Sequence, residues 1–233
     1  MDPIIRCEGV TKVYRQGDST VHALAGVDLD VAKGDFATLA GPSGSGKTTL
    51  LSLIGGLDAP TAGRIAVDGD EITALGKAAL ASLRLRKIGF VFQTYSLIPV
   101  LSALENVEFV LRLLHVDAAE RTARARETLK QVGLERLEDR RPARLSGGQQ
   151  QRVAVARALA SRPAIVLADE PTANLDTANA EALIALMARL NAELGATFLI
   201  ATHDPRVIAH ARRRIEMSDG RITSDERDAV AAA

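Results

Sequence analysis

Short apolar runs separated by turn residues fill the first third of the chain, and they predict a series of β-strands. Runs of this length, bounded by glycine, proline or aspartate, are typical of strands. The run at residues 36–40 leads into a glycine-rich loop, after which a helix is predicted to begin near Lys47. The predicted strands cover residues 4–8, 23–31, 36–40, 65–67 and 88–92.

From about residue 102 to residue 161 the pattern changes to that of helices. Apolar residues recur at three- and four-residue spacing, and a charged stretch covers residues 120–130. We therefore expect a separate helical lobe in the middle of the chain. The recurring apolar positions are Leu104, Val107, Leu111 and Leu114.

The last third returns to alternating strands and helices. A strand is predicted at residues 165–168, a helix at 177–194 and another strand at 197–201. Strands that alternate with helices favour an α/β fold with a mainly parallel sheet, which carries its ligand at the carboxyl ends of the strands. The tail after Ile222 is polar and then alanine-rich, and it gives no prediction.

Composition narrows the class of protein. The 47% apolar content is enough to build a core, and 29 Lys and Arg residues balance 29 Asp and Glu residues. A chain without net charge has no strong field for nucleic acid, so we expect no nucleic-acid partner. Cys7 is the only cysteine, which excludes an internal disulfide and a multi-cysteine metal site and fits a reducing compartment.

Two features bear on membranes. The N-terminus lacks a basic segment followed by a long apolar one, so no secretion signal is predicted. Apolar runs such as residues 164–168 are far shorter than the roughly 20 residues that cross a bilayer. Any link to a membrane is therefore expected to run through a partner.

The segment from Gly41 to Thr48 reads GPSGSGKT and fits the phosphate-binding P-loop pattern G-x-x-x-x-G-K-[ST]. Its glycines let backbone N–H groups approach phosphates, Lys47 neutralises the β- and γ-phosphate charge, and Thr48 ligates Mg²⁺. The alternative is a flexible glycine turn with a surface lysine. The preceding strand and the following helix favour nucleotide binding.

Two acids, Asp169 and Glu170, end the apolar strand at residues 165–168. Buried charge is unfavourable unless it is paired or binds a metal, so Asp169 is a candidate to hold Mg²⁺ through water. Glu170 can orient and activate the attacking water of phosphoryl transfer. The alternative is that both acids begin a solvated loop before Pro171.

The segment Leu145–Gln149 reads LSGGQ and precedes a predicted helix. Ser146 and Gln149 have the spacing of a capping box, which is the structural alternative to a functional role. A capping box does not require Gly147 and Gly148, whereas glycines leave backbone N–H groups open to an anion.

These motifs in this order resemble those of ABC ATPases over nearly the whole chain. They are the P-loop, Gln93 after a strand, LSGGQ, LADE before Pro171, NLD at residues 174–176, and His203. The resemblance implies a P-loop NTPase fold: an ABC cassette with a mainly parallel core sheet, an antiparallel β-subdomain, and a helical subdomain at about residues 94–160 inserted in a RecA-like core.

The resemblance also implies roles for single residues. Tyr14 resembles the aromatic residue that stacks on adenine, with a strand-edge aromatic as the alternative. Gln93 resembles the glutamine that contacts Mg²⁺ and water, and His203 the switch histidine that contacts the γ-phosphate. Asp176 resembles an acid that communicates across the dimer, and it can also cap the helix that begins at Thr177.

Together the motifs and the resemblance predict three sets of residues around ATP and Mg²⁺. The nucleotide set is Tyr14, Gly41, Pro42, Ser43, Gly44, Ser45, Gly46, Lys47, Thr48, Thr49, Gln93, Ser146, Gly147, Gly148, Gln149, Asp169 and His203; the catalytic set is Glu170, His203, Gln93 and Lys47; and the metal set is Thr48, Gln93 and Asp169. In this family LSGGQ of one subunit covers the ATP of the other, so a homodimer with ATP at its interface is expected.

Longer phrases are most similar to the lipoprotein-releasing and macrolide-exporter subfamily. That similarity implies an ATPase (translocase) on the cytoplasmic face of the inner membrane, peripheral and soluble when isolated, which drives a separately encoded integral membrane permease. Lipoprotein release is the first expectation. A regulatory ATPase switch of a cell-division or wall-remodelling complex stays open as the alternative. The phrases are GPSGSGKTTLL, IGGLDAPTAGRI, GFVFQTYSLIP, LSALENVE and VLADEPTANLD.

Overall fold

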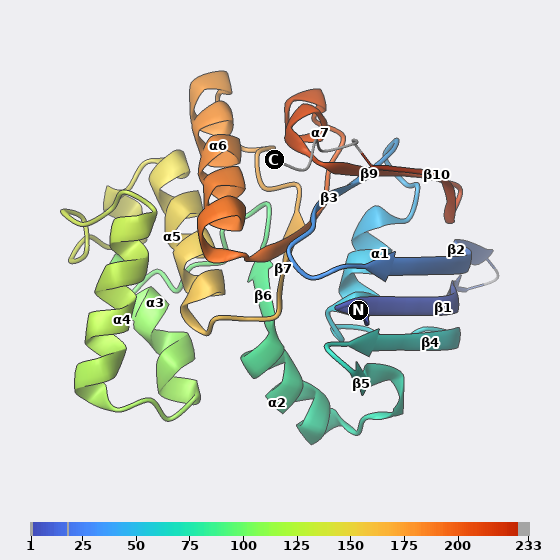
Figure 1. The fold of residues 1–233 in the computed structure, drawn as a ribbon, viewed down its shortest axis with the longest axis horizontal. Helices are drawn as coiled ribbons and strands as arrows, with labels where there is room; N and C mark the ends of the chain where they lie inside the picture. Colours follow the sequence, from blue (N-terminus) through green and yellow to red (C-terminus); the bar gives the residue numbers. More distant parts are fainter. Residues whose placement is uncertain (1, 18, 228–233) are drawn as a thin grey trace.

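The computed structural model describes residues 2–17 and 19–227, which form two sheets and the helices around them (Figure 1). The strands are β1 (Ile5–Gln16), β2 (Ser19–Val31), β3 (Phe36–Ala40), β4 (Ala62–Val67), β5 (Asp70–Glu71), β6 (Ile88–Val91), β7 (Ile165–Asp169), β8 (Thr197–Ala201), β9 (Arg213–Ser218) and β10 (Arg221–Arg227). The helices are α1 (Lys47–Ile54), α2 (Lys77–Lys87), α3 (Ala103–Leu113), α4 (Ala118–Gln131), α5 (Gly147–Ala160), α6 (Thr177–Leu194) and α7 (Pro205–His210), with 3₁₀ turns η1 (Ile72–Ala74) and η2 (Pro142–Arg144).

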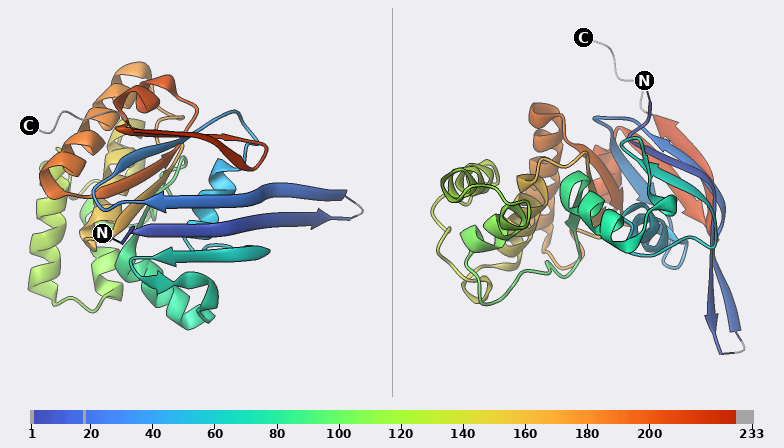
Figure 2. Two further views of the ribbon diagram at one scale, coloured as in Figure 1. Left: turned by 45° about the vertical axis from the view of Figure 1, so that its right-hand side comes forward. Right: turned by 90° about the horizontal axis from the view of Figure 1, so that it is seen from below.

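The smaller sheet is antiparallel and has the strand order β2-β1-β4-β5. Ile5 at the start of β1 lies between Val31 of β2 and Val67 of β4, and all three side chains are buried. The β1 and β2 strands are longer than predicted, and their outer parts project away from the body of the molecule (Figure 2). The pairing of β1 with β4 ends at Thr11, so the outer part of β1 pairs with β2 alone.

The larger sheet has the order β10-β9-β3-β8-β7-β6. Its strands from β9 to β6 pair in parallel, as predicted, whereas β10 runs antiparallel to β9. Parallel register places the carboxyl ends of β3, β7 and β8 at one edge of the sheet. The loop after β3, the acids at the end of β7 and the residues after β8 are therefore neighbours, although Thr48 and Asp169 alone are 121 residues apart in the sequence.

Strand side chains alternate between two hydrophobic cores, one on each face of the larger sheet. Ile165 and Leu167 of β7 pack in the core that contains α1 and the antiparallel sheet. Val166 and Ala168, the intervening residues, pack in the core that contains α3, α4, α5 and α6. Helices α1 and α5 therefore cover opposite faces of the sheet.

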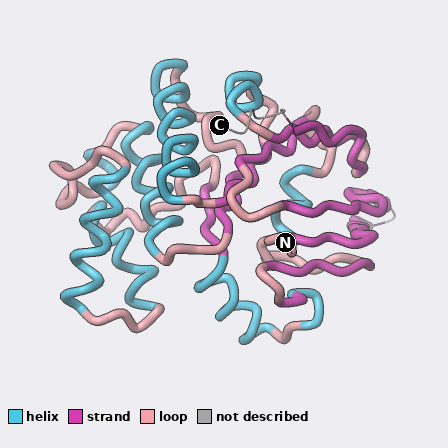
Figure 3. Tube along the Cα trace, in the orientation of Figure 1, coloured by secondary structure: helices cyan, strands magenta, loops and turns pink. Residues whose placement is uncertain are grey.

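The helical block forms as the apolar spacing predicts. Helices α3 and α4 lie at one end of the molecule, next to α5 (Figures 1 and 3). Helix α5 also packs closely on β6, because a Cβ atom on Gly89 would lie 2.5 Å from the carbonyl oxygen of Ala158. The end of the helical block is thus part of the core around the sheet, and its limits at about residues 94 and 160 stay a prediction.

Several elements did not stand out in the sequence. Helix α2, helix α7 and the hairpin β9–β10 were not predicted, and the tail after Ile222, for which the sequence analysis made no prediction, continues β10 up to Arg227. Strand β10 lies at the edge of its sheet and is mostly exposed, so it has no hydrophobic pattern. Residues 228–233, the alanine-rich end of the tail, lie outside the described residues.

Candidate nucleotide site

The P-loop joins β3 to α1, and its backbone requires glycine at two positions. Gly41 has φ 140°, and a Cβ atom there would lie 2.1 Å from the carbonyl oxygen of Met217. Gly46 has φ 102°, and a Cβ atom there would lie 2.6 Å from the carbonyl oxygen of Ala23. The loop is therefore held between β2 and the β9–β10 hairpin. Gly220 of that hairpin donates its N–H to the Ser45 carbonyl at 3.1 Å.

Lys47 places its ammonium group inside this loop. Its Nζ atom donates to the carbonyl oxygens of Gly41 and Pro42, both at 2.8 Å, and to the Ser45 hydroxyl at 3.4 Å. The residue is only 6% exposed. Helix α1 begins at Gly46 without a side-chain cap, which leaves its first N–H groups and its positive dipole end available to an anion. Ser43 and Gly44 lie in the same turn.

Thr48 and Asp169 meet across the edge of the sheet. The Thr48 hydroxyl donates to Oδ1 of Asp169 at 3.0 Å, which brings the first turn of α1 to the carboxyl end of β7. Burial raises the pKa of the Asp169 carboxyl, and the nearby Glu170 charge raises it further; the Thr48 hydrogen bond and the Lys47 charge oppose both effects. A hydroxyl and a carboxylate are oxygen donors of the kind that Mg²⁺ takes beside phosphates and water.

Glu170 follows Asp169 and has a left-handed backbone with φ 44°. Its N–H donates to the Ala201 carbonyl at 2.9 Å, and its carboxylate accepts from the Thr202 hydroxyl at 3.2 Å. The other carboxylate oxygen lies 2.7 Å from Nδ1 of His203. A left-handed conformation is unfavourable for a residue other than glycine and occurs often at functional sites. Here it directs the carboxylate toward the end of β8.

Gln93 lies two residues beyond β6, and its side chain is exposed. Val91 pairs with Ala168, so Gln93 leaves the sheet beside the two acids at the end of β7. Its carbonyl accepts from Nδ2 of Asn174 at 3.0 Å. Gln93 is therefore brought to the same edge as the P-loop.

Tyr14 lies on the outer part of β1, where it pairs with Val21 of β2. Its hydroxyl donates to Asp58 at 3.0 Å, and the Lys12 ammonium lies 4.8 Å from the ring centroid. Partial burial raises the pKa of the Tyr14 hydroxyl, and the hydrogen bond to Asp58 raises it further. The residue is 40% exposed, so ring surface remains accessible next to the first turn of α1.

LSGGQ begins α5 with the predicted capping box. The Ser146 hydroxyl accepts from the Gln149 N–H at 3.3 Å, and the Gln149 side chain accepts from the Ser146 N–H at 3.0 Å. The two glycines have a packing reason that was not predicted. A Cβ atom on Gly147 would lie 2.8 Å from the Tyr95 hydroxyl, and one on Gly148 would lie 2.6 Å from the Asn179 side chain.

Asp176 caps α6, as predicted for its structural role: its carboxylate accepts from the N–H and the side chain of Asn179 at 2.8 and 2.7 Å. The structure thus brings the P-loop, Thr48, Asp169, Glu170 and His203 together within one chain. LSGGQ forms no hydrogen bond with these residues among those the structure describes, and its helix α5 covers the other face of the sheet.

The sequence analysis did not predict three residues that lie near this site. Thr202 donates to Glu170 from the end of β8, and its position at a strand end could have indicated this. Gln151 and Arg157 of α5 donate to backbone carbonyls of residues 92–96, and Gln151 also to Pro171. Polar residues on a helix read as surface residues, so the sequence carried no signal for these two contacts.

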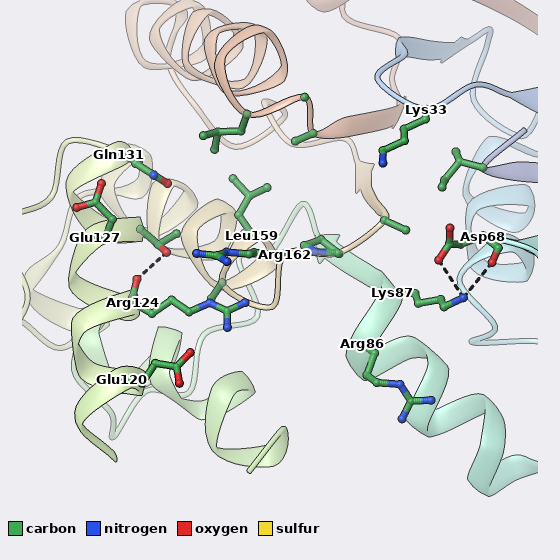
Figure 4. Close-up of a pocket in the computed structure, with 18 of the residues that line it drawn as sticks. Lys33, Asp68, Arg86, Lys87, Glu120, Arg124, Glu127, Gln131, Leu159 and Arg162 are labelled. Carbon is green, nitrogen blue, oxygen red and sulfur yellow. Dashed lines mark hydrogen bonds and ion pairs between the residues drawn. The ribbon is translucent and has the colours of Figure 1, made fainter. Parts of the chain in front are cut away.

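A cavity of about 880 Å³ lies at the opposite edge of the larger sheet, where the strands begin (Figure 4). It contains none of the predicted site residues. Arg124 and Arg162 are two of its lining residues, and burial together with the Arg162 charge lowers the pKa of the Arg124 guanidinium. The candidate nucleotide site is thus the loop edge at the carboxyl ends of the strands rather than this cavity.

Comparison with known proteins assigns the chain to a family. The family description "ABC transporter" matches residues 24–173. A lipoprotein-releasing system ATP-binding protein LolD from Anaeromyxobacter dehalogenans is 51% identical over 224 residues, which are 96% of this chain and 94% of that protein. A macrolide export ATP-binding/permease protein MacB 1/2 from Paracoccus denitrificans is 45% identical over 231 residues, which are 99% of this chain and 34% of that longer protein.

A solved structure extends the comparison to the fold. The dimeric structure of a post-hydrolysis state of the ATP-binding cassette MJ0796, bound to ADP and Pi, superimposes with a TM-score of 0.88 at 44% identity. The match covers 96% of this chain and 98% of that chain. This confirms the predicted ABC cassette fold.

The chain therefore belongs to the ABC transporter family. Within that family it is an ATP-binding subunit with the ATPase fold and activity class that the motifs predict. No helix among residues 2–17 and 19–227 is both long and apolar enough to cross a bilayer.

Proposed function

We propose that this chain hydrolyses ATP to drive a separate membrane subunit in the release of lipoproteins from the inner membrane, or in a closely related export process. The similarity to LolD along 96% of this chain supports lipoprotein release. The similarity to MacB supports a related export activity. The proposed location is the cytoplasmic face of the membrane, held there by the partner.

The observation that carries the hydrolytic part is the position of the Glu170 carboxylate. It is held by Thr202 and His203, and it directly follows the Asp169 carboxylate that contacts Thr48 of the P-loop. Phosphoryl transfer depends on positioning and on charge neutralisation, so a fixed carboxylate beside the phosphate loop suits the general base that takes a proton from the attacking water.

Lys47 and the N-terminus of α1 would bind the phosphates, and His203 would contact the γ-phosphate from the end of β8. Tyr14 would stack on adenine with its exposed face, next to Thr49. The remaining P-loop residues, from Ser43 to Gly46, would line the phosphates with backbone N–H groups, whereas Pro42, which has no N–H, would only shape the loop.

The donor set at Thr48 and Asp169 fits Mg²⁺, because the two oxygens lie 3.0 Å apart and the carboxylate is half-buried beside the phosphate loop. Thr48, Asp169 and Gln93 would hold the ion, directly or through water. When bound, Mg²⁺ would neutralise charge on the β- and γ-phosphates.

The active form is proposed to be a head-to-tail homodimer. Ser146, Gly147, Gly148 and Gln149 begin a helix on the face of the sheet opposite to α1, so they suit a contact with the nucleotide of a second copy. The related cassette MJ0796 is dimeric in its ADP- and Pi-bound state, which supports this arrangement.

The test of hydrolysis is Glu170→Gln, which keeps size and polarity and removes the base. We expect ATP binding to stay within about twofold, turnover to fall by about 1000-fold or more, and an ATP-bound dimer to accumulate in size-exclusion chromatography. Turnover close to that of the unchanged protein would refute the assignment of Glu170.

The test of the transport role is to isolate the chain with its membrane partner from detergent-solubilised native membranes and to identify that partner. A subunit with four transmembrane helices and a long periplasmic domain is expected. A six-helix channel-type permease would contradict lipoprotein release, and a complex with a division or wall-remodelling protein would favour the regulatory alternative.

A further inference from the structure

Gln151 is a fully buried amide on α5 that joins two segments of the nucleotide site. Its exposed fraction is 0%, and its Nε2 atom donates to the carbonyl oxygen of Phe92 at 3.3 Å and to that of Pro171 at 2.9 Å. Phe92 immediately precedes Gln93, and Pro171 immediately follows Glu170. One side chain therefore holds the backbone next to both residues.

The fold explains why one amide can reach both carbonyls. Strands β6 and β7 are parallel neighbours, with Val91 opposite Ala168, so the two segments leave the sheet side by side. Helix α5 lies directly on β6 at Gly89. The second turn of α5 then passes over the point where both strands end, five residues beyond Ser146.

A polar side chain at position 151 is not needed to fill the core. Among the described residues its Oε1 atom has no hydrogen-bond partner, although it is buried. A buried amide oxygen without a partner is unfavourable, and a methionine or leucine would fill the same space without that penalty. The benefit of the amide is its two N–H groups, each of which meets a carbonyl.

The Pro171 carbonyl depends on this contact. No other donor within the described part of the chain bonds to it, whereas the Phe92 carbonyl also accepts from the Tyr95 N–H at 3.3 Å. Glu170 has a left-handed φ of 44°, so the orientation of its carboxylate depends on how the following residue is held. The backbone just after the proposed base is thus tied to α5.

We infer that Gln151 is a positioning residue for ATP hydrolysis: it fixes Gln93 and Glu170 relative to each other and links both to the helix that begins with LSGGQ. The inference rests on the proposed role of Glu170. Gln151 contacts neither nucleotide nor water in this account, and its effect passes through the two backbone segments.

Arg157 of the same helix provides a comparison. Its guanidinium donates to the carbonyls of Tyr95 and Ser96, and burial lowers its pKa. These contacts hold the loop that follows Gln93, and they do not involve the segment after Glu170. Removal of Arg157 should therefore disturb one of the two segments that Gln151 holds.

The experiment compares Gln151→Met with Gln150→Met in the purified full chain. Gln150 donates to the Leu145 carbonyl within its own helix region, so the same substitution there leaves both segments tied. For Gln151→Met we expect kcat to fall by about 10- to 100-fold while KM and the Kd for ATP change by less than about threefold, since misplacement of catalytic groups affects the transition state. Gln150→Met should keep kcat within about threefold, and Arg157→Met should fall between the two.

An unchanged kcat in Gln151→Met would overturn the inference, and so would a parallel loss of kcat, ATP affinity and melting temperature, which would indicate a structural role only. Gln151→Asn keeps the amide but shortens its reach, and the same selective loss of kcat is expected there; it decides the question if the methionine variant does not fold. Glu170→Gln in the same assay separates the two proposals, because an active Glu170→Gln protein would refute the base whatever Gln151 does.

Discussion

The P-loop and LSGGQ are both serine- and glycine-rich segments that begin a helix, yet the chain builds them in different ways. At the P-loop, α1 begins at Gly46 with no side-chain cap, and Lys47 adds a positive charge within the loop. At LSGGQ, α5 begins at Ser146, whose hydroxyl and N–H are both satisfied by Gln149. The first N–H groups of α1 therefore stay available to a ligand, whereas at α5 the Gln149 N–H is already bonded to Ser146.

Their glycines differ as well. Gly41 and Gly46 have positive φ angles and pack against backbone carbonyls, so these positions require glycine for conformation and for space. Gly147 and Gly148 are helical, and they are required only because Tyr95 and Asn179 lie close to them. The P-loop backbone thus has a conformation that only glycine adopts readily, while LSGGQ begins a regular helix.

The difference teaches that the two segments cannot perform the same task. The P-loop has what a complete phosphate site needs within one chain, namely shape, N–H groups and a cation. LSGGQ lacks a cation in its motif and lies over the opposite face of the sheet. It suits a surface that completes a nucleotide site on a second copy.

The largest expected effect comes from Lys47→Ala, which removes the cation that the P-loop has and LSGGQ lacks. ATP affinity should fall by about 30- to 100-fold, since a charge-assisted hydrogen bond contributes about 2–3 kcal/mol, and hydrolysis should be lost at ordinary ATP concentrations. Titration with a fluorescent ATP analogue measures the affinity. Lys33→Ala, at the opposite edge of the sheet, is the control and should bind ATP normally.

An intermediate effect is expected from Gly148→Ala. The new Cβ atom would lie 2.6 Å from the Asn179 side chain, whose amide donates a hydrogen bond to Asp176, so the start of α5 must shift. Turnover should fall by about 10- to 100-fold with unchanged ATP affinity. Gly147→Ala meets only the end of the Tyr95 side chain, which can rotate, and should lose less than about fivefold.

Mixing the two variants tests the comparison directly. In a head-to-tail dimer of Lys47→Ala with Gly148→Ala, one site contains both defects and the other contains neither. Turnover should therefore recover to roughly a quarter of the original, if dimers form at random and the sites act independently. A mixture no more active than its components would mean that LSGGQ serves its own chain.

Local patterns explain which features the sequence could predict. The P-loop, the two acids at the end of β7 and the capping box of Ser146 and Gln149 are short motifs, whose residues lie close together in the sequence. The alternation of strands with helices was likewise enough to predict a parallel sheet with the carboxyl ends of its strands at one edge. Residues 221–227 escaped prediction because an edge strand exposed to solvent needs no apolar alternation.

The contacts of Gln151 show the limit of that approach. Its partners lie 59 and 20 residues away, and they are backbone carbonyls, which every residue possesses. No pattern of residue types encodes such a contact. The packing reason for Gly148 has the same origin, because Asn179 is brought to it only when α6 docks beside α5.

The smallest effect comes from two capping boxes that are alike in geometry. Ser102 begins α3 with Glu105 as its partner, just as Ser146 begins α5 with Gln149. Ser102→Ala and Ser146→Ala should each lower the free energy of unfolding by about 1 kcal/mol, or the melting temperature by about 2–4 °C. Thermal unfolding measures both.

The two serine substitutions should differ in their effect on ATP hydrolysis. If Ser146 also contacts the nucleotide of a second copy, Ser146→Ala should lower turnover about 3- to 10-fold, because one neutral hydrogen bond contributes about 0.5–1.5 kcal/mol, whereas Ser102→Ala should leave turnover unchanged. Equal turnover in both variants, measured at matched stability, would reduce Ser146 to a helix cap. The functional difference between LSGGQ and an ordinary helix start would then rest on Gly147 and Gly148 alone.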